Sequence, residues 1–144
     1  MRNKLGSLPP GMSRLGSLVR IDMRDNRIPA MPDLARASNL REVCLGNNGI
    51  ITVGDLTCLP PSTRILDLRD NAIAVIPGSI SHLVQLERLD VSNNELSGLP
   101  AELGALPVNA IVVDGNPMRK IRRDIISKGT MAIMKHLRNM VRWP

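Results

Sequence analysis

The chain has 144 residues, a formal net charge of +6 and a 43% hydrophobic composition in which Trp143 is the only aromatic residue. This length suits one domain, and no apolar run approaches the ~18 residues that a membrane span needs. Its two cysteines, Cys44 and Cys58, have no second Cys or His pair beside them, so they predict neither a disulfide framework nor a metal site. They favour a reducing compartment.

The first residues are basic and serine-containing, with Arg2, Lys4 and Arg14 and no acid among residues 1–17. This composition is similar to that of a mitochondrial targeting segment. However, Pro9 and Pro10 would break an amphipathic targeting helix. We therefore expect a cytoplasmic protein and keep a mitochondrial location as the minor alternative.

One asparagine recurs every 22–23 residues through the chain: Asn3, Asn26, Asn48, Asn71, Asn94 and Asn116. Aliphatic residues stand three and five places before it and two places after it, wherever the chain extends far enough. The alternation before each asparagine predicts one short strand per unit. The asparagine amide can bridge adjacent coils, because it offers two donors and one acceptor, so we interpret it as structural.

The pattern L-x-x-L-x-L-x-x-N-x-L resembles the intracellular leucine-rich repeat superfamily. The end of the chain, GNPMRKIRRDIISKGTMAIMKHLRNM (Gly115 to Met140), resembles the closing segment of large multi-repeat members of that superfamily. The resemblance implies an α/β leucine-rich repeat solenoid, with a curved parallel sheet on its concave face and loops or short helical turns on its convex face. It also implies two parts, the repeats over residues 1–117, whose first unit is truncated, and a C-terminal helical cap over residues 118–144.

Charged residues recur at the repeat positions that point out of the predicted sheet, so they should form columns on the concave face. The candidate partner-binding residues are Arg20, Asp22, Arg24, Asp67, Arg69, Arg88 and Asp90. Two interpretations are open. Surface ion pairs that neutralise one another would contribute only ~0–1 kcal/mol each, whereas a polar face could select a partner by charge complementarity. The lack of aromatic anchors favours the first interpretation over strong binding.

Positive charge is concentrated at the C-terminal end, where residues 118–144 carry eight basic residues and one acid. The proposed basic patch consists of Arg119, Lys120, Arg122 and Arg123. Thr130 is a predicted N-cap for a helix that places Ile133, Leu137 and Val141 on one face. The segment is either a solvated cap or a patch for an acidic protein or RNA, although missing aromatics argue against base stacking.

The first repeat begins part-way through its strand, which predicts an uncovered edge near Leu5 and Leu8. A larger assembly could cover that edge. No nucleophile–base, paired-carboxylate or phosphate-loop pattern occurs in the sequence, and no cofactor is expected. We therefore expect a non-catalytic protein–protein interaction scaffold or adaptor. The alternative is a structural subunit of a ribonucleoprotein or another large assembly that uses the basic cap.

Overall fold

The computed structural model describes residue 16 and residues 18–141, with the side chain of the last of these left out. Leu5 and Leu8 lie outside the described residues, so the predicted N-terminal edge stays a prediction.

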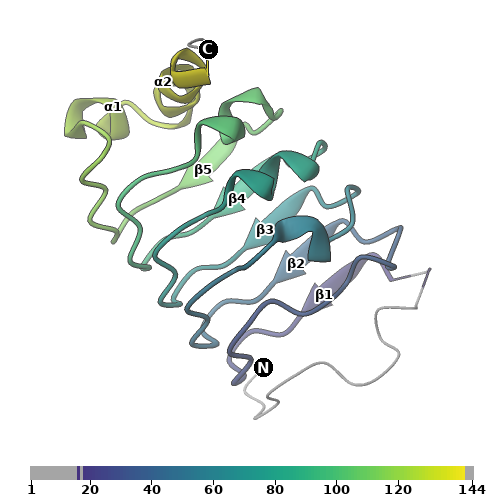
Figure 1. The fold of residues 1–144 in the computed structure, drawn as a ribbon. Coiled ribbons are helices and arrows are strands. Elements are labelled where there is room, and N and C mark those ends of the chain that lie inside the picture. Colours follow the sequence, from purple (N-terminus) through teal and green to yellow (C-terminus); the bar gives the residue numbers. More distant parts are fainter. Residues whose placement is uncertain (1–15, 17, 142–144) are drawn as a thin grey trace.

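Five short parallel strands form one sheet in the order of the sequence (Figure 1). They are β1 (Arg20–Asp22), β2 (Glu42–Cys44), β3 (Ile65–Asp67), β4 (Arg88–Asp90) and β5 (Ala110–Val112). Equivalent repeat positions pair across every neighbouring pair of strands, as Ile21 does with Val43 and Leu66 with Leu89. The middle residue of each strand is buried. This arrangement confirms the predicted α/β solenoid and its register.

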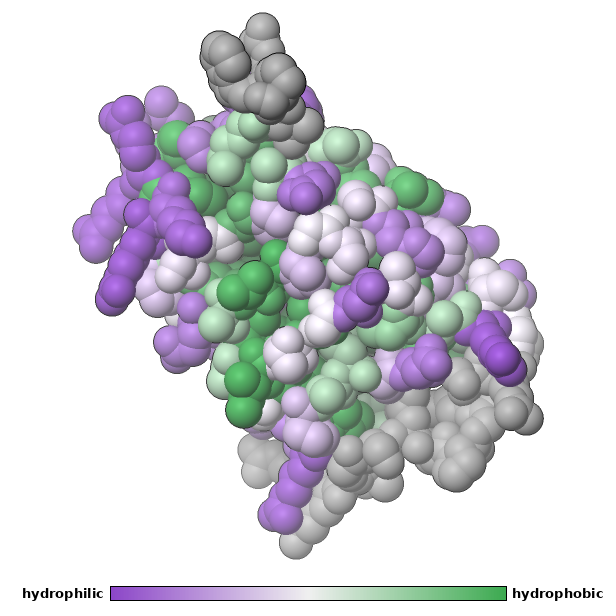
Figure 2. Space-filling view, in the orientation of Figure 1, coloured by the Kyte–Doolittle hydropathy of each residue, from purple (hydrophilic) through white to green (hydrophobic). Residues whose placement is uncertain are grey.

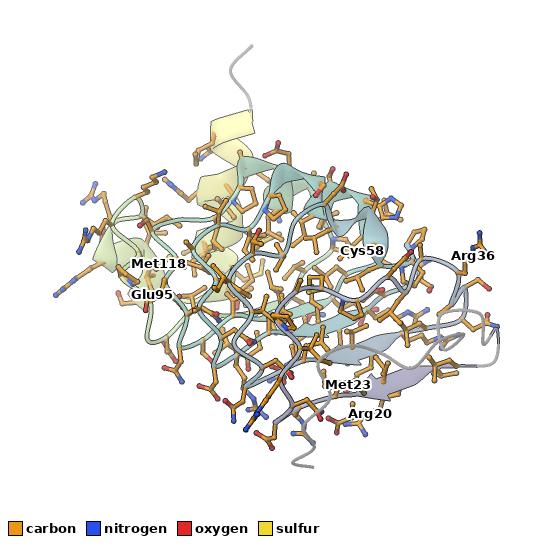
Figure 3. All side chains as sticks on the ribbon, turned by 60° about the horizontal axis from the view of Figure 1, so that its bottom comes forward. Arg20, Met23, Arg36, Cys58, Glu95 and Met118 are labelled. Carbon is orange, nitrogen blue, oxygen red and sulfur yellow. The ribbon has the colours of Figure 1, made fainter. Side chains whose placement is uncertain are left out.

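In the three coils between β2 and β5, a short 3-10 helix lies on the side opposite the sheet. These helices are η2 (Leu56–Cys58), η3 (Gly78–His82) and η4 (Ala101–Ala105). The carboxylate of Asp55 caps η2 by accepting a hydrogen bond of 3.0 Å from the backbone N–H of Thr57. Apolar side chains fill the space between the two layers (Figure 3), and 33 of them form one continuous buried core. Each coil therefore buries its leucines only by stacking on its neighbours.

The recurring asparagine joins consecutive coils through backbone groups. The Asn71 side-chain oxygen accepts from the N–H of Ile50 at 3.0 Å, and its amide donates to the carbonyls of Leu45 at 3.2 Å and Leu68 at 2.9 Å. Asn48 and Asn94 repeat this pattern one coil away. The asparagines of the described coils are structural, as the sequence indicated.

The residue before each of these asparagines has a left-handed backbone. The column consists of Asp25 (φ 60°), Asn47 (φ 57°), Asp70 (φ 56°), Asn93 (φ 55°) and Gly115 (φ 77°). Asn, Asp and Gly are the residues that tolerate this conformation best. The turn after each strand therefore restricts the residue type at two neighbouring positions, and the sequence analysis identified only the asparagine of the two.

Two helices follow the last coil, α1 (Arg123–Ser127) and α2 (Thr130–Val141). α2 packs on η4 so closely that a Cβ added to Gly104 would lie 2.6 Å from the backbone nitrogen of Arg138. The guanidinium Nε of Arg138 also donates to the carbonyl of Gly104 at 3.0 Å. Ile133 and Leu137 are buried. No helix in the described part of the chain is long and apolar enough to cross a membrane.

The predicted N-cap at Thr130 is wrong by one residue. The first hydrogen bond of α2 runs from the N–H of Ile133 to the carbonyl of Gly129, so Gly129 occupies the N-cap position and Thr130 is the first helical residue. The Thr130 hydroxyl instead accepts from the N–H of Ile111 in β5 at 3.0 Å. This threonine caps the edge of the sheet, because that edge offers it an unpaired donor.

Candidate functional site

The outward side chains of the five strands, together with the side chains two residues after each strand, form the sheet face, which contains all seven residues proposed for the concave surface. The register aligns Arg20, Glu42, Ile65, Arg88 and Ala110 in one column and Asp22, Cys44, Asp67, Asp90 and Val112 in the next. A shallow depression of about 320 Å³ lies over β1–β4, and every proposed residue except Asp22 lines it. The structure therefore brings six of the seven residues together around one depression, and their role in binding stays a prediction.

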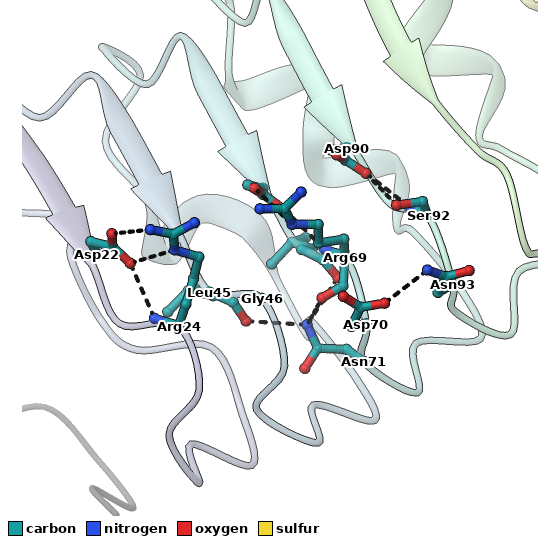
Figure 4. A network of polar contacts seen from close by, with 12 residues as sticks. Asp22, Arg24, Leu45, Gly46, Arg69, Asp70, Asn71, Asp90, Ser92 and Asn93 are labelled. Carbon is teal, nitrogen blue, oxygen red and sulfur yellow. Dashed lines mark hydrogen bonds and ion pairs between the residues drawn. The ribbon is translucent and has the colours of Figure 1, made fainter. Parts of the chain in front are cut away.

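At the β1 end of the sheet face, the charges are closed into ion pairs (Figure 4). Arg24 donates from Nε to Asp22 Oδ1 at 2.8 Å and from Nη2 to Asp22 Oδ2 at 2.7 Å. This two-pronged geometry is the strong form of the pair. The hydrogen bond from Arg24 is the main reason that the pKa of Asp22 is lowered to about 2. Arg20 pairs with Glu42 at 2.7 Å.

Around β3 and β4, the contact between arginine and aspartate is longer than at β1. Arg69 lies 3.5 Å from Asp67, and burial raises the pKa of Asp67 above its ordinary value. The neighbouring carboxylate of Asp90 raises it further. Asp90 is itself only 6% exposed, and it accepts from the N–H and hydroxyl of Ser92 at 3.1 and 2.7 Å. Arg88 is exposed and makes no ion pair with any described residue.

Glu42 is a member of this face that the sequence-based set omitted. It occupies the same repeat position as Arg20 and Arg88, so the register alone could have identified it. With Glu42 included, the face has four arginines and four carboxylates, and its formal charge is zero. The face therefore carries a pattern of charge without a net charge.

The thiol of Cys44 lies in the same surface but has no catalytic environment. It is buried, and its pKa is raised first by burial and then by nearby carboxylates, chiefly Glu42. A thiolate is the reactive form of cysteine, so this environment opposes nucleophilic chemistry. Within the described residues, no group of three or more His, Cys, Asp or Glu side chains could hold a metal ion.

The proposed basic patch is divided between two places. Arg119, Arg122 and Arg123 line a hollow of about 680 Å³ between the last coil and α1. Lys120 instead extends over the preceding coil, where its Cβ lies 3.0 Å from a Cβ built on Gly98. All four side chains belong to exposed residues, and hydrophilic side chains gather around α1 in Figure 2.

Comparison with known proteins agrees with the repeat and the fold. A family model described as "Leucine rich repeat" matches residues 38–96. Leucine-rich repeat serine/threonine-protein kinase 1 of Caenorhabditis elegans is 38% identical over 97 residues, which are 65% of this chain and 4% of that protein. A solved leucine-rich repeat protein of Leptospira interrogans superposes with a TM-score of 0.78 at 26% identity, over 95% of this chain and 33% of that one. The plant peptide hormone receptor RGFR1 in complex with RGF2 gives a TM-score of 0.69 at 28% identity, over 77% of this chain and 19% of that one.

Residues 38–96 thus match the leucine-rich repeat family, and the chain has the α/β solenoid fold of leucine-rich repeat proteins. Domains of this class generally mediate protein–protein interaction, and their shared fold does not by itself specify a partner. The chain spans between 4% and 13% of the length of four curated relatives that it matches.

Proposed function

We propose that this chain is a non-catalytic scaffold or adaptor that binds another protein across the sheet face. The observation that carries the proposal is the depression over β1–β4, in which opposite charges stand at fixed positions and Arg88 has no ion-pair partner among the described residues. Charge patterns of this kind contribute more to partner selection than to raw affinity. Side chains that are already held in place lose less entropy on binding.

The interaction should depend on the unpaired arginine of the depression. We expect Arg88→Glu to weaken partner capture strongly, because it replaces an available cation with an anion beside Asp67 and Asp90. Lys135→Glu on the exposed side of α2 makes the same change in net charge and is the matched control. Quantitative affinity purification with mass spectrometry would compare both variants with the parent chain, after circular dichroism has shown that all three are folded. Equal recovery of every partner by both variants would overturn the proposal.

A second candidate function uses the basic residues beside α1. Exposed Arg119, Arg122 and Arg123 surround one hollow, which supports a structural role in a ribonucleoprotein or another assembly. Phosphate contacts would make binding fall steeply as salt rises. Nuclease treatment during the purification distinguishes the two forms of this candidate. Partners lost after nuclease treatment would support RNA, and partners retained after it would support acidic protein.

We also propose that the protein works in a reducing compartment such as the cytoplasm. The support is that Cys44 and Cys58 are both free thiols. Imaging of a tagged full-length protein is the direct measurement, and a mitochondrial signal would favour the alternative location.

A further inference from the structure

Just after its strand, each described coil before the last donates backbone hydrogen bonds to the next coil. The first residue after the strand donates its N–H to the following strand, as Met23 does to Cys44 at 2.8 Å and Val91 does to Val112 at 2.9 Å. Two residues further on, a second N–H does the same, as in the bond of 2.8 Å from Asn93 to Asp114. The pair of bonds recurs at β2 and β3. In every described coil before the last, both N–H groups therefore have an acceptor in the next coil.

In the last coil, the equivalent donors are the N–H groups of Val113 and Gly115. Neither group donates a hydrogen bond to any described residue. Only the earlier donor on this edge is capped, because the Thr130 hydroxyl accepts from Ile111. α2 thus provides an acceptor for one N–H group of this edge, and the next two outward-pointing N–H groups have none among the described residues.

The two uncapped donors belong to residues that line the hollow of about 680 Å³. Val113 and Gly115 line it from the last coil, and Ile126 and Ser127 line it from α1. By the geometry of the four preceding coils, both N–H groups point toward the place that a further strand would occupy. In a strand, groups two residues apart are separated by roughly 6.6 Å, so the two donors match alternate carbonyls of one extended chain.

The rim of this hollow is positively charged. Arg119, Arg122 and Arg123 line it, and Asp114 is the only acidic residue among the described lining residues. Asp124 lies 3.2 Å from Arg122, in an ion pair between exposed side chains. Such a pair contributes little and is easily exchanged for another carboxylate. The backbone donors thus select an extended peptide, and the arginines select an acidic one.

We propose that an extended acidic segment of a partner protein docks in this hollow as a sixth parallel strand. Its carbonyl oxygens accept from the N–H groups of Val113 and Gly115, and its carboxylates pair with Arg122 and Arg123. Strand addition of this kind takes affinity from main-chain bonds and specificity from side chains. The proposal uses different residues from those of the sheet face and stands whether or not that face binds a protein.

A short synthetic peptide of alternating glutamate and valine residues is a suitable probe. We expect it to slow amide hydrogen exchange at Val113 and Gly115 and to shift their NMR resonances, since both N–H groups become hydrogen-bonded. Inorganic phosphate and a peptide of alternating lysine and valine residues are the control ligands. Unchanged exchange at both amides in the saturated glutamate complex would overturn the proposal, as would equal protection by phosphate.

Charge reversal tests the arginine rim separately. The double variant Arg122→Glu, Arg123→Glu should bind the glutamate peptide about tenfold more weakly or worse, because two attractions become repulsions. The double variant Lys128→Glu, Lys135→Glu has the same net charge but alters residues outside the lining, so its affinity should stay close to that of the parent chain. Equal weakening in both variants would indicate only a general charge effect and refute the docking site. Resonance shifts confined to Arg88 and its neighbours would place the peptide on the sheet face and also refute it.

Discussion

Replacing one bridging asparagine should destabilise the whole stack, and Asn71 is the best position to test. Its side-chain oxygen accepts from the N–H groups of Asn48 and Ile50, both at 3.0 Å, and its amide donates to Leu45 and Leu68. The amide also donates to the carbonyl of Arg69 at 3.2 Å, so in Asn71→Ala two N–H donors and three carbonyl acceptors lose this partner. A buried polar group left without a partner costs about 1–3 kcal/mol. Because Asn71 is only half-buried, water can satisfy some of these groups, and we expect a net loss of about 2–4 kcal/mol.

The free energy of unfolding can be measured by urea titration followed by circular dichroism. Asn93→Gly is the matched control, because Asn93 is an exposed asparagine of the same turn whose side chain makes one bond of 2.8 Å to Asp70. Glycine suits its left-handed backbone, which has φ 55°. We expect the control to change stability by no more than about 0.5 kcal/mol. Equal losses of stability in the two variants would show that the asparagine bridges do not hold adjacent coils together.

Three further predictions concern packing and titration. Gly104→Ala should lower the free energy of unfolding by about 1–3 kcal/mol in a thermal or urea melt, because its Cβ would lie 2.6 Å from the backbone of α2. Gly16→Ala is the control and should be neutral, because a Cβ at Gly16 would have no described atom within 4 Å. The pKa of Asp22 in the folded chain, about 2, lies below its ordinary value, so the ionised carboxylate stabilises the fold above about pH 4. Up to about 2 kcal/mol of this stability is lost as the pH falls toward 2. Asp22→Asn should flatten the curve of stability against pH in that window. Burial raises the pKa of Cys58 to about 11, so iodoacetamide should modify it at pH 8 more slowly in the native chain than in urea; equal rates would contradict this.

The repeat made the register of the sheet predictable, and the register in turn located most of the sheet face. A period of 22–23 residues assigns every residue a place in its coil, so the repeat pattern alone aligns Asp67 with Asp90. The left-handed column was also visible in the sequence, as the Asp, Asn or Gly that precedes each asparagine from Asn26 onward. These features depend only on local backbone geometry, which the repeat specifies.

Features that depend on contacts between coils or between the sheet and the helices were not predictable. The choice of Glu42 as the partner of Arg20 is one case, since it depends on side-chain conformers across two strands. The direction of the Thr130 hydroxyl is another, because the uncapped N–H of Ile111 competes for it. The hollow beside α1 is the third. Its shape follows from where α1 packs, and the repeat pattern ends before α1 begins.

Differences in electrostatic environment indicate where a partner of the sheet face should bind. Asp22 is already neutralised by the two bonds of Arg24, so a partner cation placed there would have to displace an existing pair. Asp67 is different, because burial and the charge of Asp90 raise its pKa and its contact with Arg69 is the looser one. The attraction of a partner cation would offset the cost of burying the Asp67 carboxylate, and the resulting pair would be shielded from water. The centre of the proposed interface should therefore lie over β3 and β4, with the ion pairs of β1 at its rim.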